Sequence, residues 1–208
     1  MIAWSRFAII PSTRFKRTMP FIPGVGDLDA RVCWDEEQAF PVQWPNMATG
    51  EAGRVESIHL AVSEGEPMRA ADRIRVLAGI GLEGDRYATG RGHFSSTPGT
   101  GRALTLIEAE VLESLRDTLG IALQPGEARR NVTTRGIALN ALVGRRFRVG
   151  GVLCEGKRLC EPCRYLEGIV AKPLLDALTH RGGLRADVLE DGMICVGDEL
   201  QVLESPLV

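Results

Sequence analysis

The sequence has no excess of positive charge, no long apolar run and few cysteines, and each shortage excludes a class of protein. The 208 residues carry a formal net charge of −2, so the basic face of a general nucleic-acid-binding protein is not expected. No apolar run approaches the roughly 20 residues that a membrane-spanning helix needs. The apolar share of 44% is that of a chain that can bury a core. We therefore expect one domain, with neither nucleic acid nor membrane as a partner.

The start of the chain lacks the pattern of an export signal. Arg6 interrupts a short apolar stretch and basic residues follow it, whereas a signal peptide has one longer apolar segment and a cleavage site of small residues. A cytoplasmic location is therefore expected. The five cysteines are odd in number and, without an export signal, argue against a disulfide framework. Reduced thiols are the expected state.

Residues 1–52 show neither a helical nor a strand period. Residues 17–46 hold four prolines and two of the three tryptophans. Two interpretations stay open, an irregular N-terminal arm or a mispredicted start in which Met47 is the true initiator. The folded domain is expected over residues 53–208.

From residue 53 onward, the apolar residues follow the period of two that marks half-buried strands. Strands are predicted over 54–62, 72–80, 102–107 and 129–136. Their predicted inward faces include Ile58, Leu60 and Val62 in the first strand and Ile74, Val76 and Ala78 in the second. Gly150-Gly151 predicts a hairpin, and Asp191-Gly192 predicts a second one, followed by a last strand.

Two segments favour helices. Residues 107–120 place Ile107, Val111, Leu112, Leu115 and Leu119 on one side, with Gly120 as the C-cap. Residues 166–183 repeat the pattern, but Pro173 predicts a kink or two shorter helices. Many short strands with few helices, and no strict βαβ alternation, predict a mainly β, α+β barrel.

The segment LCEPCRYLEGI, residues 159–169, raises the question of what Cys163 does. Pro162 disfavours helix before it and a helical pattern begins near Tyr165, so Cys163 is expected at a helix N terminus with Arg164 beside it. Reactive thiolates occur in such settings. The pattern supports a nucleophilic or sulfur-carrying thiol, and a packing role at the helix start is the alternative.

Cys160 and Cys163 also form a C-x-x-C pair, which opens two further interpretations. A structural zinc site usually has two such pairs, and no second pair occurs. A thioredoxin-like redox pair would need a βαβ context, which the pattern does not show. Cys154 and Cys195 fall in strand patterns and are expected in the core.

Two segments are candidates for anion binding. Residues 79–94 form a glycine-rich loop in which a ligand could approach the backbone, although GIGLEG alone is a weak dinucleotide motif. His93 in this loop is expected to face solvent or pack rather than catalyse. Residues 125–136 carry several arginines, which bind phosphate and carboxylate through forked hydrogen bonds. A surface loop and a solvated strand edge are the alternatives.

Five segments resemble the MOSC domain in order and spacing. This family takes its name from the C-terminal domain of molybdenum cofactor sulfurases and includes small stand-alone bacterial members. The resemblance covers about residues 53–203 and implies a β-barrel with a few helices. The segments are GLEGDRY, LTLIEAE, PGEARRNVTTRGIALNALVGRRFRVGG, LCEPCRYLE and HRGGLRADVLEDGMICVGDEL.

The resemblance also implies a site. The family's G-x-x-G-D element falls on Gly81, Gly84 and Asp85. Its asparagine-arginine-glycine element falls on Asn131, Arg135 and Gly136, with Arg130 where many members have glutamate. The family's P-C cysteine matches Cys163, and is thought to carry sulfur or to contact molybdenum. The residues implied to bind the molybdenum cofactor are Gly81, Gly84, Asp85, Arg86, Arg130, Asn131, Arg135 and Arg164.

The resulting hypothesis is a molybdenum-cofactor-binding or sulfur-carrier protein in which Cys163 holds a persulfide or contacts molybdenum. It would act in cofactor sulfuration or in a molybdenum-dependent reduction, and whether the chain is itself an enzyme stays open. A separate pyridoxal-phosphate-dependent cysteine desulfurase would supply the sulfur, because no site for pyridoxal phosphate is recognised in this chain. The alternatives are a non-catalytic adaptor for a partner oxidoreductase and a thiol-redox protein using Cys160 and Cys163.

Overall fold

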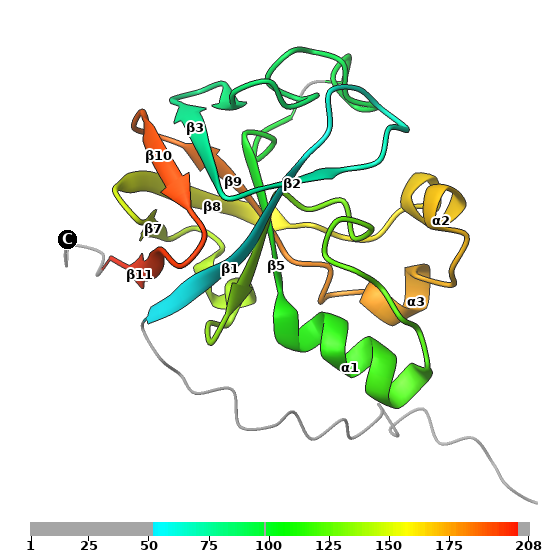
Figure 1. The fold of residues 1–208 in the computed structure, drawn as a ribbon. Coiled ribbons are helices and arrows are strands. Elements are labelled where there is room, and N and C mark those ends of the chain that lie inside the picture. Colours follow the sequence, from blue (N-terminus) through cyan, green and yellow to red (C-terminus); the bar gives the residue numbers. More distant parts are fainter. Residues whose placement is uncertain (1–51, 98, 204–208) are drawn as a thin grey trace, which may run out of the picture. The chain divides into compact units, whose positions relative to one another are not determined.

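The structure is a computed structural model that describes residues 52–97 and 99–203 (Figure 1). Residues 1–51 of the predicted arm, with Met47, lie outside this part. The helices are α1 (Ala109–Leu119), α2 (Arg164–Val170) and α3 (Leu175–Leu178), with a 3-10 helix η1 (Leu139–Leu142). The strands are β1 (Ala52–Leu60), β2 (Arg69–Ala71), β3 (Arg73–Leu77), β4 (Gly81–Leu82), β5 (Leu104–Glu108), β6 (Val132–Arg135), β7 (Arg146–Val149), β8 (Val152–Leu159), β9 (Leu184–Val188), β10 (Gly192–Cys195) and β11 (Glu199–Val202).

Seven strands close into a barrel, which confirms the predicted mainly β fold. Their order is β11-β7-β8-β9-β5-β6-β1, and β1 pairs with β11 to complete the ring. Neighbouring strands in the ring are antiparallel apart from β5 and β6, which are parallel. β2 extends from β1, while β10, β3 and β4 form a separate small sheet. Closure leaves the barrel strands without unpaired edges.

The barrel interior follows the strand alternation expected from the sequence. Cys154 on β8 pairs with Val188 on β9, and both are buried in one apolar cluster with Val152 and Leu184. Cys154 is fully buried, which confirms its predicted core role, and this burial raises the pKa of its thiol to about 12. Cys195 is only half-buried.

The helices pack together in a second apolar cluster, beside the barrel. In α1, Val111 and Leu115 are buried, but Leu119 is 51% exposed, so its predicted inward position is wrong. Gly120 ends the helix at a φ of 66°, as predicted. Pro173 lies between α2 and α3, which confirms the prediction of two shorter helices. None of the described helices is long and apolar enough to cross a membrane.

The two predicted hairpins have different outcomes. Gly150-Gly151 connects the antiparallel strands β7 and β8, as expected. The hairpin predicted at Asp191-Gly192 is wrong, because β9 pairs with β5 and β8 whereas β10 pairs with β3. The Asp191 carboxylate accepts a hydrogen bond from the Ala78 backbone N–H at 2.7 Å, and so ties this turn to the end of β3.

The buried residues of β1 also differ from the prediction. The pairing of β1 with β6 shifts register between Val55 and Ser57, so Val55 and Ile58 are the buried residues. Leu60 is half-buried and Val62, beyond the strand end, is 40% exposed. In β3, Val76 is buried as predicted, whereas the predicted inward position of Ala78 lies outside the strand and is exposed.

Candidate functional site

Cys163 is the N-cap residue of α2, as predicted, and its side chain is half-buried. It lies between two cavities. One, of about 40 Å³, we call the Arg129 pocket; the other, of about 230 Å³, we call the Arg158 pocket. The Arg129 pocket is lined by Arg86, Tyr87, His93, Phe94, Thr105, Arg129, Arg130, Cys160, Cys163, Tyr165, Leu166 and Arg185. The Arg158 pocket is lined by Phe94, Arg102, Arg158, Glu161, Cys163 and Arg185.

Arg129 supplies a buried and incompletely bonded cation to its pocket. The residue is 8% exposed, and its Nη1 donates to the Glu66 carbonyl oxygen at 2.7 Å. Its Nη2 is buried, and no described residue bonds it. Burial lowers the pKa of Arg129, and the nearby charge of Arg86 adds to the effect. Because a buried donor without a partner is costly, this nitrogen marks a position that an anionic ligand would stabilise.

Arg130 is bonded instead to the backbone on three sides. Its Nε donates to the Gly182 carbonyl at 2.8 Å, its Nη1 to Ala128 at 2.9 Å and its Nη2 to Cys160 at 2.8 Å. It therefore fixes the segment that precedes Cys163 against the rest of the domain. Its charge reaches the pocket, but these nitrogens are already engaged by protein groups, which departs from the ligand contact expected for it.

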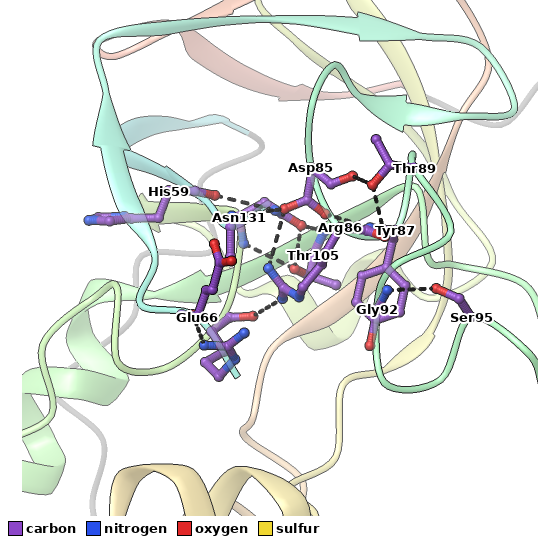
Figure 2. A network of polar contacts seen from close by, with 12 residues as sticks. His59, Glu66, Asp85, Arg86, Tyr87, Thr89, Gly92, Ser95, Thr105 and Asn131 are labelled. Carbon is purple, nitrogen blue, oxygen red and sulfur yellow. Dashed lines mark hydrogen bonds and ion pairs between the residues drawn. The ribbon is translucent and has the colours of Figure 1, made fainter. Parts of the chain in front are cut away.

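Asp85 and Asn131 are the centre of a buried network (Figure 2). The Asp85 carboxylate accepts hydrogen bonds from Arg86 Nη1 at 3.2 Å, Asn131 Nδ2 at 3.3 Å and the Tyr87 backbone N–H at 3.1 Å. Asn131 Oδ1 in turn accepts from the Thr105 hydroxyl at 2.7 Å. Arg86 and Asp85 are 5% and 2% exposed. The network fixes the glycine-rich loop to the barrel, so in this structure Asp85 and Asn131 position the site.

Two of the predicted cofactor-binding residues are glycines with different surroundings. Gly81 has a φ of 113°, and a Cβ there would lie 2.4 Å from the Ala103 carbonyl oxygen. Gly84 has a φ of 79°, and a Cβ there would meet open space. Neither glycine lines the two pockets at Cys163. The sequence predicted a close approach between this loop and a ligand, but Gly81 instead approaches the protein backbone at Ala103.

We expect Gly81→Ala to destabilise the protein more than Gly84→Ala. Both substitutions force a left-handed residue to carry a side chain, which costs about 1–2 kcal/mol. Only Gly81→Ala adds a collision with backbone, worth about another 1–3 kcal/mol. Denaturant unfolding of the two variants measures the difference. Equal losses would show that the contact with Ala103 relaxes at no cost.

The structure does not bring Arg135 and Arg164 to the pockets. The Arg135 guanidinium lies between two carboxylates, with Nη2 2.6 Å from Glu113 Oε1 and Nε 2.5 Å from Glu56 Oε2. These partners raise its pKa, and they already neutralise its charge. Arg164 is exposed at the start of α2 and lines neither pocket. The sequence predicted both arginines at an anion site, but neither lines a cavity at Cys163.

An aromatic group that the sequence does not predict lines the Arg129 pocket. The His93 and Tyr165 rings stack at a centroid distance of 3.8 Å and an interplanar angle of 6°, with Phe94 edge-on to both. The Tyr165 hydroxyl accepts a hydrogen bond from the Gly65 backbone N–H at 3.0 Å. The stack connects the glycine-rich loop to α2, which agrees with the packing role expected for His93. The sequence contains no periodic signal for this contact.

A third cavity, of about 600 Å³, adjoins the site through Arg129. We call it the His59 pocket; apart from Arg129 it shares no residue with the two pockets at Cys163. His59 Nδ1 is buried without a partner among the described residues, and burial lowers the pKa of this imidazole. The pocket is lined by His59, Gly65, Pro67, Met68, Ala70, Gln124, Pro125, Gly126, Glu127, Arg129, Ile169 and Val170.

The described cysteines do not gather into a metal-binding cluster. Cys154, Cys160, Cys163 and Cys195 are free thiols, and Cys160 is 1% exposed. Within the described residues, no group of three or more histidine, cysteine, aspartate or glutamate side chains could hold a metal ion. Of the two cysteines in the C-x-x-C pair, Cys160 is buried, so the half-buried thiol of Cys163 is the one that a ligand can reach.

The domain is thus a closed barrel in which Cys163 lies beside cavities lined by arginines. The family model described as the MOSC domain matches residues 89–201, which is more than half of the chain. The chain belongs to the MOSC domain family, which is associated with the molybdenum cofactor. A search of curated proteins finds no match.

Several solved structures share the fold. YuaD from Bacillus subtilis superposes with a TM-score of 0.62 at 18% identity, over 73% of this chain and 95% of that one. YiiM from Geobacillus stearothermophilus gives a TM-score of 0.56 at 19% identity, over 73% of this chain and 75% of that one. YiiM from Escherichia coli gives 0.53 at 20% identity, over 73% and 70%. At these identities the similarity establishes the fold.

Proposed function

We propose that this MOSC protein handles sulfur for the molybdenum cofactor and that Cys163 carries the sulfur as a persulfide. The observation behind the proposal is the position of a half-buried thiol between two cavities that several arginines line. A persulfide ionises to an anion, and a cationic surrounding stabilises that anion. Asp85 neutralises Arg86 beside the Arg129 pocket, but no acidic side chain of the described residues lines the pocket itself, where Arg129 and Arg130 keep their positive charge.

The residues present fit an anionic cofactor with a pterin ring. The unbonded Nη2 of Arg129 offers a donor for an anionic group, and the His59 pocket is the one of the three with room for a ring system. Arg129, His59 and Met68 would hold the organic part, and Cys163 would lie toward the metal. When bound, the cofactor supplies the redox chemistry of molybdenum.

The chain's own groups would hold and protect the sulfur. Cys163 carries the transferable atom, while the stacked rings of His93 and Tyr165 cover one side of the Arg129 pocket and reduce the access of water. Arg130 acts as a positioning residue, since its bond to the Cys160 carbonyl fixes the backbone three residues before the thiol. The donor in this proposal is a cysteine desulfurase or a small molecule.

The test is to produce the protein together with the cofactor biosynthesis enzymes and to measure bound molybdopterin and cyanide-releasable sulfur. We expect both in the wild type and expect Cys163→Ser to lose the releasable sulfur entirely. Cys195→Ser is the matched control, because Cys195 is also a half-buried free thiol but lines neither pocket at Cys163. Absence of both sulfur and molybdopterin from the wild type would refute the proposal.

A further inference from the structure

The Arg158 pocket, on the other side of Cys163, has a charge arrangement that the proposed function does not explain. Arg158 on β8 and Arg185 on β9 are direct cross-strand partners. Like charges placed opposite each other on neighbouring strands destabilise a sheet. A third guanidinium, from Arg102, lines the same cavity and is held by the carbonyl oxygens of Phe94 and Thr97. Three cations thus meet in one small space.

The described part of the chain offsets this charge only in part. Neither Arg158 nor Arg185 pairs with a carboxylate there, and Arg185 Nε is buried without a hydrogen-bond partner. The one acidic side chain that lines the pocket, Glu161, accepts hydrogen bonds from the His180 backbone N–H and lies 2.9 Å from His180 Nδ1. Burial and the charges of Arg185 and Arg102 lower the pKa of Arg158. A bound dianion would relieve this repulsion.

The size and contents of the pocket narrow the choice of dianion. Its volume of about 230 Å³ suits a small molecule, and Cys163 lines it beside the arginines. Cys160, the other nearby thiol, is buried and does not line this pocket, so Cys163 is the thiol that an anion carrying a transferable sulfur atom would meet here. Arginine forks match tetrahedral oxyanions well.

We propose that the Arg158 pocket binds a small sulfur oxyanion of the thiosulfate class, and that Cys163 takes its outer sulfur atom. This inference rests on the proposed role of Cys163 as a persulfide carrier, and it names the sulfur donor. Arg102, Arg158 and Arg185 bind the sulfonate oxygens, and the outer sulfur faces the thiol.

The transfer balances without an added oxidant or reductant. The Cys163 thiol first loses its proton to water. The thiolate then attacks the outer sulfur of thiosulfate and a new sulfur–sulfur bond forms. The bond between the two thiosulfate sulfurs breaks, and sulfite leaves with the bonding electron pair. The total charge is unchanged, and the product on the protein is the ionised persulfide of Cys163. The arginines hold sulfite as well as thiosulfate, so they stabilise the leaving group.

The experiment incubates the purified full-length protein with thiosulfate and measures released sulfite and the mass of the protein. We expect one sulfite for each protein that gains one sulfur atom at Cys163. Arg158→Gln is expected to lower the rate constant at low thiosulfate by roughly tenfold or more, the effect of losing one charge-assisted contact. Arg116→Gln, at an exposed arginine of α1 that pairs with Asp117, should leave the rate unchanged.

Binding is measured separately by the rise in melting temperature with added thiosulfate. We expect the rise in the wild type, in Cys163→Ser and in Arg116→Gln, and expect it to be much smaller in Arg158→Gln. Arg158 is exposed, and its removal relieves repulsion, so this variant should fold. Arg158→Lys keeps the charge but loses the forked hydrogen bonds. Its rise in melting temperature should lie between those of the wild type and Arg158→Gln.

The outcomes separate this inference from the function on which it rests. Sulfur loading from a cysteine desulfurase and cysteine, without any loading from thiosulfate, overturns the inference and leaves the persulfide role standing. Loading from neither donor refutes both. Loading from thiosulfate at equal rates in Arg158→Gln and Arg116→Gln overturns the assignment of the pocket. A thermal shift without sulfite release, as for an anion that only binds, also overturns it.

Discussion

Asp85→Ala is expected to lower the free energy of unfolding by about 3–5 kcal/mol, because it leaves the guanidinium of Arg86 buried without its counter-charge. Arg86 and Asp85 are 5% and 2% exposed, and their side chains meet at 3.2 Å. The same substitution removes the acceptor for Asn131 Nδ2 and for the backbone N–H groups of Ala61 and Tyr87. Urea-induced unfolding measures the loss.

The control for this prediction is Asp72→Ala, at an exposed aspartate between β2 and β3. It should change the unfolding free energy by no more than about 0.5 kcal/mol. Asp85→Asn keeps the shape of the side chain but not its charge. Its loss of unfolding free energy should lie between those of Asp85→Ala and Asp72→Ala. A loss below about 1 kcal/mol for Asp85→Ala would contradict the view that this network fixes the glycine-rich loop.

Glu108→Gln is expected to stabilise the protein at pH 8 by up to about 3 kcal/mol. Glu108 is 4% exposed at the junction of β5 and α1, and burial raises its pKa from 4.5 to about 7. Its Oε1 accepts from the Leu139 N–H at 3.0 Å, while Oε2 is buried without a partner among the described residues. Between about pH 4.5 and pH 7 the folded protein therefore holds a proton that the unfolded chain has lost, and at pH 8 it carries a buried charge that the glutamine variant lacks.

The sign of the pH dependence follows from this difference in bound protons. Between about pH 4.5 and pH 7 the folded state binds more protons at Glu108 than the unfolded state, so this residue makes stability fall as pH rises. Glutamine resembles the neutral acid, and the variant should lack this fall. Unfolding free energies measured at several pH values from 4 to about 8 test it.

Glu113→Gln is the matched control for the direction of this effect. Its hydrogen bond with Arg135 lowers the pKa of Glu113, so the charged form is the favoured one. Neutralising it should not raise stability at pH 8. An unchanged pH dependence in Glu108→Gln would mean that the Glu108 carboxyl is not held neutral by burial.

Those parts of the fold that depend on neighbours in sequence could be predicted. The two-residue turn at Gly150-Gly151 and the break at Pro173 both have local causes, and both predictions are confirmed. The turn at Asp191-Gly192 has the same local signal, but β10 pairs with β3, and Asp191 bonds the Ala78 N–H 113 residues away. Composition cannot reveal a partner at that separation.

The candidate site shows the same division. Cys163 could be placed at a helix start from Pro162 and the helical pattern that follows. Arg135 was expected to bind an anion, yet its acceptors Glu56 and Glu113 are 79 and 22 residues away. Arg158 and Arg185 meet only through the register of β8 and β9. The local sequence signal for an anion site was a cluster of basic residues. Such a cluster does not distinguish an arginine that a carboxylate neutralises from one that is free to bind a ligand.

The pairing of β1 with β11 has a consequence for synthesis in the cell. These strands come from opposite ends of the described domain, Ala52 lying opposite Gln201 (Figure 1). During translation the barrel can close only after Val202 has left the ribosome, so a nascent chain that still lacks β11 exposes β1 without its last partner. Such long-range closure is slow, and chaperones would have their longest opportunity to bind at this stage.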